Sequence, residues 1–424
     1  MNFSCKNPIV IMCNSFSETN RDIGTSVQRY KKTFNDKVFC NTKDTILAFS
    51  QAVRPIFIYF FVILQQISNN VQAPVMEKKT VLFIVNPISG TSGKTRIPKL
   101  IDEYLDHEKF DYEIRMTEYA GHATEIANEG KDRNTDIIVA VGGDGTVNEV
   151  ARALTHSHSA LGIIPSGSGN GLARHLLLPM NVRKCIEIIN ACDIRELDYG
   201  TIDGHPFFCT CGVGFDAFVS QKFAEAGKRG PMTYLENILR EGLRYKPETY
   251  EIVNENGTIE YQAFLVSCAN ASQYGNNAYI APQASMSDGL LDIIIMEPFD
   301  ILEAPQISLE IFNKTLDKSS KIQTFKTKEM HIRRSKPDVI HYDGDPVMAG
   351  TDIHVKIEPK GIKIIVNPYG NTETRKPNAF QTATAELFNE INIMRENLQK
   401  RLTAQNRSAS KPEASAETTD RNQK

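Results

Sequence analysis

A glycine-rich turn between a buried strand and an amphipathic helix restricts the fold of this chain more than any other feature. Residues 137–141 are consecutive apolar residues, and a pair of glycines ends that run. From Val147 onward, apolar residues recur with the period of one buried helix face. Thr146 is placed to cap this helix, with Glu149 completing a capping box. The segment therefore predicts a strand, a tight turn and a helix of an α/β domain.

The turn itself is suited to hold an anion. Gly142, Gly143 and Gly145 have no Cβ, so a ligand can approach the backbone closely, and the helix start behind them offers free N–H groups. Asp144 would repel a bare phosphate, so we expect a metal ion or a transferred proton between the two. The alternative is a structural turn in which Asp144 only caps the helix.

Two further strand ends carry the same kind of turn. An apolar run at residues 81–85 leads into a Gly/Ser loop, which misses the phosphate-loop pattern because Ile88 stands where its first glycine belongs. The apolar residues 161–164 lead into the sequence PSGSGN, and between these an alternating strand ends at Thr117. Because parallel strands end at a common edge where ligands bind, three such turns fit a polyphosphate nucleotide better than a single anion or a dinucleotide.

Composition limits the other classes of function. The chain has 424 residues, which predicts two domains with tails, and its formal net charge of -3 gives no basic excess for binding nucleic acid. The eight cysteines form no zinc-binding pattern, and we expect Cys209 and Cys211 to be buried thiols in a reducing cytoplasm.

The first 75 residues differ from the rest. Their apolar run at residues 55–64 is too short to span a bilayer and does not match a secretory signal. Met76 opens a basic segment that continues directly into a strand. We interpret Met76 as the natural initiator and residues 1–75 as an extension that the fold does not need.

Three motifs together resemble one family. NPISG at residues 86–90, GGDGTVNEV at 142–150 and PSGSGN at 165–170 resemble the catalytic domain shared by diacylglycerol kinases, sphingosine and ceramide kinases and the soluble bacterial lipid kinases. GGDGT alone also occurs in NAD kinases, and the combination is more specific. Gly171 stands where many bacterial members carry Asp, which is closer to the sphingosine and ceramide kinase form.

The resemblance covers residues 78–368 and implies the domain organisation. A Rossmann-like parallel α/β nucleotide domain is expected at residues 76–198, followed by a β-sandwich at 199–370 whose last strand is a candidate to return to the first domain. Short strands around Asn256-Gly257, a strong turn dipeptide, agree with this. The strands are expected at 250–253, 259–268, 290–296, 330–333, 340–342, 353–357 and 362–366, with a helix inserted at 231–245.

By resemblance, ATP would bind in the cleft between the domains. The implied contacts are Asn86, Thr117, Gly142, Gly143, Asp144, Gly145, Thr146, Val147, Asn148 and Ser168. Asp144 would also act catalytically by orienting the phosphates or their metal.

Two acidic segments of the second half resemble family sites. Residues 285–292 resemble a Mg2+ loop, whose matched ligands are the Asp288 carboxylate and the carbonyls of Ser285 and Leu290; a plain Asp-Gly turn is the alternative. HYDGDP at residues 341–346 resembles the DGE motif. Its third position, Asp345, would be the general base. Asp343 would be a structural or metal partner, with a plain turn residue as the alternative, and it is the second candidate for the base.

The tail at residues 371–424 predicts one amphipathic helix followed by a polar, unfolded stretch. We favour a solvated helix or one packed in a homodimer over one that touches a membrane or another partner.

We therefore expect an ATP- and Mg2+-dependent lipid kinase acting on a lipid such as diacylglycerol or a sphingoid base. It would be cytoplasmic and dock transiently on the membrane surface, for example through Lys228, Arg229 and Met232. The alternatives are a kinase of a soluble acceptor such as NAD, and a regulator that binds nucleotide or lipid without catalysis.

Overall fold

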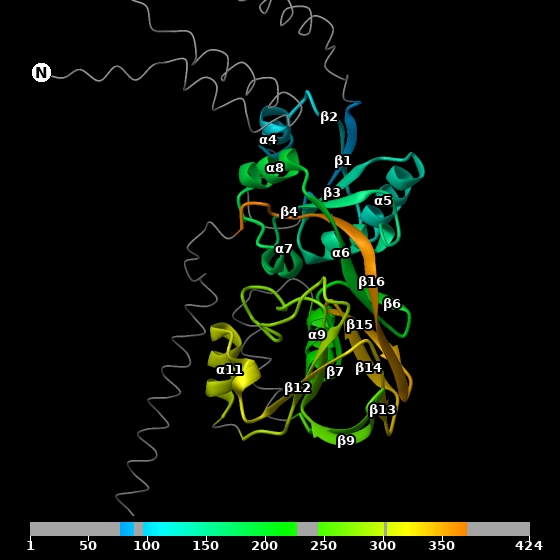
Figure 1. Cartoon of the computed structure of the whole chain (residues 1–424), viewed down its shortest axis with the longest axis vertical. Coiled ribbons are helices and arrows are strands. Elements are labelled where there is room, and N and C mark those ends of the chain that lie inside the picture. Colours follow the sequence, from blue (N-terminus) through cyan, green and yellow to red (C-terminus); the bar gives the residue numbers. More distant parts are fainter. Residues whose placement is uncertain (1–76, 89–95, 227–244, 301–302, 371–424) are drawn as a thin grey trace, which may run out of the picture. The chain divides into compact units, whose positions relative to one another are not determined.

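The computed structural model describes residues 77–88, 96–226, 245–300 and 303–370, all within one compact unit (Figure 1). The segment 1–75, most of the helix expected at 231–245 and the tail at 371–424 lie outside the described residues. The same holds for Lys228, Arg229 and Met232, which we expected at a membrane.

The first half of the described chain is an α/β layer built on parallel strands, as predicted. Strands β1 (Lys79–Val85), β2 (Phe110–Met116), β3 (Ile137–Gly142) and β4 (Ala160–Pro165) lie in the order β2-β1-β3-β4. The apolar runs of β1, β3 and β4 are buried because helices cover both faces of such a sheet. The helices are α4 (Ile97–Tyr104), α5 (His122–Asp132), α6 (Asp144–Ala153), α7 (Gly171–His175) and α8 (Val182–Ala191).

The second half contains the predicted β-sandwich. Its strands are β5 (Ile194–Ile202), β6 (His205–Phe207), β7 (Thr210–Gly214), β8 (Glu248–Asn254), β9 (Gly257–Ala263), β10 (Leu265–Ala269), β11 (Leu291–Met296), β12 (Ile322–Thr327), β13 (Glu329–Arg334), β14 (Asp338–Tyr342), β15 (Asp345–Ala349) and β16 (Asp352–Ile365). Helices α9 (Phe215–Ala226) and α11 (Ala304–Asn313) and the short helix η2 (Leu316–Lys318) complete it. One antiparallel sheet has the order β12-β11-β10-β7-β14-β15, and β16, β13, β8 and β9 extend the sheet of the α/β layer. Apolar side chains of both sheets form a shared core.

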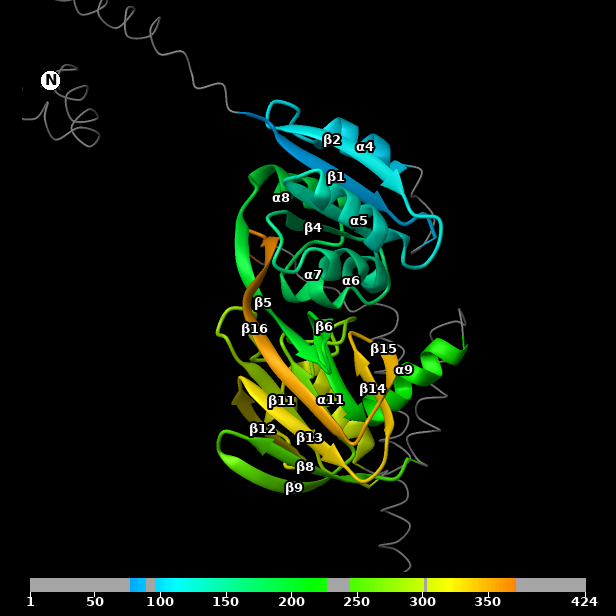
Figure 2. The same ribbon diagram turned by 90° about the vertical axis from the view of Figure 1, so that its right-hand side faces the viewer.

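The long strand β16 joins the two halves (Figure 2). It pairs with β13 and with β5 in antiparallel fashion, and with β4 in parallel fashion at Ile364. Its register with β5 shifts between Glu358 and Ile362. The strands expected at 353–357 and 362–366 are therefore one strand with an irregularity in its middle.

Two local predictions were wrong. The strand expected at 259–268 is broken at Phe264, because β9 belongs to the sheet of β8 whereas β10 pairs with β7 and β11 in the other sheet. The capping box is also absent: α6 begins at Asp144 with Gly143 as its N-cap. Glu149 instead accepts hydrogen bonds from two backbone N–H groups at the start of α5, at 2.9 and 3.1 Å.

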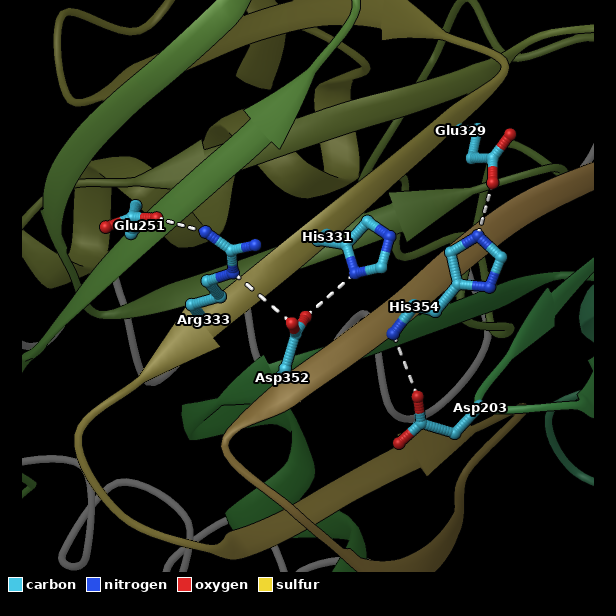
Figure 3. A network of polar contacts seen from close by, with 7 residues as sticks. All are labelled: Asp203, Glu251, Glu329, His331, Arg333, Asp352 and His354. Carbon is cyan, nitrogen blue, oxygen red and sulfur yellow. Dashed lines mark hydrogen bonds and ion pairs between the residues drawn. The ribbon is translucent and has the colours of Figure 1, made fainter.

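The outer face of β13 and β16 is covered by charged side chains (Figure 3). His331 and His354 are register partners, and their rings stack at a centroid distance of 4.8 Å. Each ring contacts an acid, Asp352 at 2.8 Å and Glu329 at 2.6 Å. Exposed polar contacts of this kind contribute little to stability, so their effect is to keep this face of the sheet polar.

Buried Asp198 on β5 fastens the irregular part of β16. Its carboxylate accepts hydrogen bonds from the backbone N–H of Lys360 and of Gly289, both at 2.8 Å, and its own N–H donates to Met286 O at 2.7 Å. Asn270 also donates to its carbonyl, at 2.9 Å. A single side chain thus joins the middle of β16 to the loop that precedes β11.

We predict that Asp198→Asn lowers the free energy of unfolding by about 1–3 kcal/mol, because the amide NH2 would face one of the two backbone N–H groups and leave it unsatisfied. Asp203→Asn is the matched control, since Asp203 accepts one backbone N–H, from His354, at an exposed position (Figure 3). Urea denaturation of both variants measures the difference. Equal, small losses would show that the Asp198 contacts are dispensable.

Candidate active site

The carboxyl ends of the parallel strands meet at one edge of the sheet. Three backbone hydrogen bonds step along this edge, from Thr117 N to Val85 O at 2.9 Å, from Asn86 N to Val141 O at 3.0 Å and from Ser166 N to Gly142 O at 2.7 Å. The turns after β1, β2, β3 and β4 are therefore adjacent, as the sequence predicted for the nucleotide edge. The rest of the Gly/Ser loop after Ile88 lies outside the described residues.

Close backbone packing explains several of the glycines here. A Cβ on Gly167 would lie 2.5 Å from the Cα of Gly143, and a Cβ on Gly169 would lie 2.6 Å from Asp144 Oδ2. The turns after β3 and β4 can touch only because both lack side chains at these points. Gly145 differs, because a Cβ there would meet no atom within 4 Å among the described residues outside its own helix turn, and the residue is exposed. Its side of the turn is open to a ligand.

Asp144 connects the two turns. Its Oδ2 accepts a hydrogen bond from Asn170 N at 2.8 Å, and its Oδ1 accepts one from Gly171 N at 2.7 Å. Burial raises the pKa of this carboxyl, and the two backbone N–H groups oppose that rise. Asp144 therefore shapes the glycine-rich edge directly, a role that the sequence analysis did not predict.

The other residues predicted to contact a nucleotide divide into two groups. The side chains of Thr117, Thr146, Val147 and Asn148 are buried. Thr146 Oγ1, for example, accepts a hydrogen bond from Asn86 Nδ2 at 3.0 Å. Ser168 and Gly145 are exposed, so they and the turn backbone are the parts accessible to a ligand.

The second predicted site is the two-residue turn between β14 and β15. Asp343 and Gly344 both have positive φ, of 51° and 87°, as a tight Asp-Gly hairpin requires. The Asp343 carboxylate accepts three backbone hydrogen bonds, from Phe208 at 2.8 Å, Cys209 at 2.7 Å and Thr210 at 3.1 Å. Burial raises the pKa of Asp343 to about 6, although these N–H groups and the charge of Arg152 lower it. Cys209 and Cys211 are buried, as predicted.

Asp345 lies on the exposed side of the same turn. Its Oδ2 is 2.8 Å from Arg152 Nη2, and its side chain is 52% exposed. Arg152 also stacks over the ring of Tyr342, with its Cζ 4.7 Å from the ring centroid. Because Arg152 lies near the end of α6, the helix that starts at the glycine turn also contacts the acidic turn.

A buried pair of a histidine and an aspartate lies next to this turn, and the sequence did not predict it. His341 Nε2 is 3.0 Å from Asp216 Oδ2, and both side chains are largely buried. The backbone N–H of Gly344 donates to His341 Nδ1 at 3.4 Å, which fits a neutral ring that donates from Nε2 to Asp216. Asp216 is in the first turn of α9, so the pair fixes β14 against that helix. Nothing in the local sequence distinguishes Asp216 from an ordinary acid at a helix start.

The predicted Mg2+ loop is occupied by a lysine. Asp288 Oδ2 is 2.8 Å from Lys326 Nζ, and Asp288 Oδ1 accepts a hydrogen bond from Leu290 N at 3.1 Å. Ser285 Oγ lies 3.2 Å from Ser287 Oγ. The structure shows no group of three or more His, Cys, Asp or Glu side chains that could hold a metal within the residues that it describes. In this arrangement Ser285, Asp288 and Leu290 do not fit a resident Mg2+, because the carboxylate already has a cationic partner.

Among the helices of the described residues, none is both long enough and apolar enough to cross a bilayer.

Comparisons with known proteins match both halves of the chain. Residues 80–202 match the family model of the diacylglycerol kinase catalytic domain. Residues 209–366 match the model of the YegS C-terminal NAD kinase beta sandwich-like domain. The two matches follow each other in the order of the α/β layer and the β-sandwich.

Relatives and solved structures agree with these matches. A protein from Escherichia fergusonii named "Probable lipid kinase YegS" is 26% identical over 294 residues, covering 68% of this chain and 96% of the relative. An uncharacterized protein of Synechocystis sp. is 29% identical over 303 residues, covering 68% of this chain and 70% of the relative. A diacylglycerol kinase structure from Bacillus anthracis shares the fold, with a TM-score of 0.56, 23% identity and coverage of 68% of this chain and 97% of that one. This chain accordingly carries a diacylglycerol kinase catalytic domain followed by a YegS-type C-terminal domain, and it is a kinase.

Proposed function

We propose that this kinase transfers the γ-phosphoryl group of ATP to the hydroxyl of a membrane lipid, such as diacylglycerol or a sphingoid base. It would act in the cytoplasm, docking transiently on the membrane surface. The observation that carries the proposal is the ion pair of Arg152 with Asp345, which brings the helix of the glycine turn against the acidic turn. Phosphoryl transfer needs a phosphate-binding turn and a proton acceptor on adjoining elements, and this contact joins the acidic turn to the far end of the helix that starts at the glycine turn.

The glycine-rich edge would bind ATP. The phosphates would pass over Gly145, where the turn is open, toward the N–H groups at the start of α6. Exposed Ser168 would contact them from the neighbouring turn, and Asn86 and Thr117 would border the site. Mg2+ arriving with ATP would neutralise phosphate charge, and Asp144 is the carboxylate at this edge that would face it.

The acidic turn would receive the acceptor hydroxyl. Asp345 is the exposed carboxylate of the pair, so it is the one that can meet a substrate and accept its proton. Asp343 would hold the turn in shape, because its oxygens accept three backbone N–H groups. Arg152 would then position Asp345 through the ion pair.

We predict transfer of label from γ-labelled ATP to a lipid presented in mixed micelles or anionic vesicles. Diacylglycerol, a sphingoid base and NAD are offered side by side. Asp345→Asn should reduce turnover by about 100-fold or more with nearly unchanged ATP affinity, because general bases contribute about 100- to 10,000-fold. Asp343→Asn is the comparison, and it should lose stability as well as activity.

The outcomes of this assay separate the alternatives. Label on NAD alone would favour a kinase of a soluble acceptor. Nucleotide binding without turnover on any lipid would favour a non-catalytic regulator. Full turnover by Asp345→Asn would move the proton acceptor elsewhere, with Asp343 as the next candidate.

A pair of variants in the glycine turn tests where ATP binds. Gly145→Ala should leave the melting temperature unchanged, because the added methyl group meets no atom within 4 Å among the described residues outside its own helix turn. If the phosphates pass over this turn, the same methyl group should weaken ATP binding by about tenfold or more. Asp144→Asn should reduce turnover by about 100-fold. It should also lower the melting temperature, because one backbone N–H loses its acceptor at a cost of about 1–3 kcal/mol, and each kcal/mol corresponds to about 2–4 °C. Wild-type ATP affinity in Gly145→Ala would contradict this nucleotide site.

The rate should also depend on pH through Asp343. Since its pKa is about 6, turnover should fall as the pH is lowered through that value and Asp343 becomes protonated. Arg152→Gln removes a positive charge that lowers this pKa, so the acid limb of the pH–rate profile should move to higher pH. Arg152→Lys keeps the charge and serves as the control. An acid limb at the same pH in all three proteins would show that the protonation of Asp343 does not set the fall in rate at low pH.

A further inference from the structure

The loop before β11 has a cation supplied by the protein itself. Lys326 is on β12, directly opposite Asp292 in the register of β11 with β12. Its Nζ lies 3.1 Å from Asp292 Oδ2 and 2.8 Å from Asp288 Oδ2. One ammonium therefore bridges two carboxylates, one from the loop and one from the strand that follows it.

The charges at this point require such a bridge. The side chains of Asp288 and Asp292 are 31% and 15% exposed, so water screens their mutual repulsion only in part. Burial and the Asp288 charge raise the pKa of Asp292, whereas Lys326 lowers it. A divalent ion would need to displace this ammonium, whose residue the strand register places opposite Asp292.

The loop is also anchored without a metal. Gly289 N donates to Asp198 Oδ2 at 2.8 Å, and Asp198 N donates to Met286 O at 2.7 Å. These two hydrogen bonds fasten both ends of the turn that contains Asp288 to β5. The backbone geometry of the turn thus comes from contacts within the protein.

We propose that the ammonium of Lys326 takes the place of a divalent cation in this loop, so that the folded β-sandwich needs no bound Mg2+. A resident ion of this loop is distinct from the Mg2+ that would accompany ATP. Lys326 is the residue that makes the loop independent of metal.

The test is the melting temperature of the full chain in EDTA and in millimolar Mg2+, without nucleotide. Wild type should melt at the same temperature in both. Lys326→Met leaves the two carboxylates without their cation, so it should melt lower in EDTA and regain about 2–4 °C or more in Mg2+. Calorimetric titration with Mg2+ should show one binding site gained by this variant.

Two controls make the result specific. Lys356→Met removes another half-exposed lysine with a single carboxylate partner, Glu358 at 2.6 Å, and should show no response to Mg2+. Adding Asp288→Asn to Lys326→Met should abolish the response. A wild-type protein that melts lower in EDTA would overturn the proposal, as would a folded Lys326→Met protein that ignores Mg2+. If Lys326→Met does not fold, Lys326→Gln takes its place, and the wild-type comparison decides by itself.

Discussion

The antiparallel pairing of β5 with β16 is the constraint on which both halves of the molecule depend. Beyond β5, β16 borders β4 of the parallel sheet and β13 of the sandwich, so one continuous sheet carries both. The register between β5 and β16 shifts between Glu358 and Ile362, and the buried Asp198 carboxylate binds the backbone of Lys360 within that shift. The glycine turn and the acidic turn belong to different halves. The paired strands β5 and β16 and the Arg152–Asp345 contact therefore fix their relative position.

Much of the fold could be predicted because hydrophobic period reflects burial directly. The apolar runs of β1, β3 and β4 are buried on both faces, and the alternation in β13 places Met330 and Ile332 inward and His331 outward. The errors arose where contacts between distant segments override the local sequence pattern. Glu149 matches a capping box in sequence, but it caps the neighbouring helix α5 instead. The segment at 259–268 has no local mark of the point where the chain passes from one sheet to the other.

The candidate site could likewise be predicted only in part from the sequence. Glycine-rich turns and Asp-Gly pairs are local patterns, so the sequence identified both turns. Arg152 and Asp345 are 193 residues apart, and Asp216 and His341 are 125 apart. A lone arginine or a lone aspartate has no motif, and only the folded sheet brings such partners together. The same is true of Lys326, whose position opposite Asp292 is a matter of strand register.

The five acids that matter most fall into two classes that residue type cannot separate. Asp144, Asp198 and Asp343 each accept at least two backbone N–H groups, so their main effect is to set the shape of loops. Asp288 and Asp345 are more exposed and face the side-chain cations Lys326 and Arg152. Asp343 is enclosed by three backbone donors and has little freedom to bind a new partner, whereas Asp345 is paired with one arginine at an exposed position and can exchange that partner for a substrate. By this criterion Asp345 is the acid of its turn that is free for chemistry, and Asp343 is the acid that holds the turn in place.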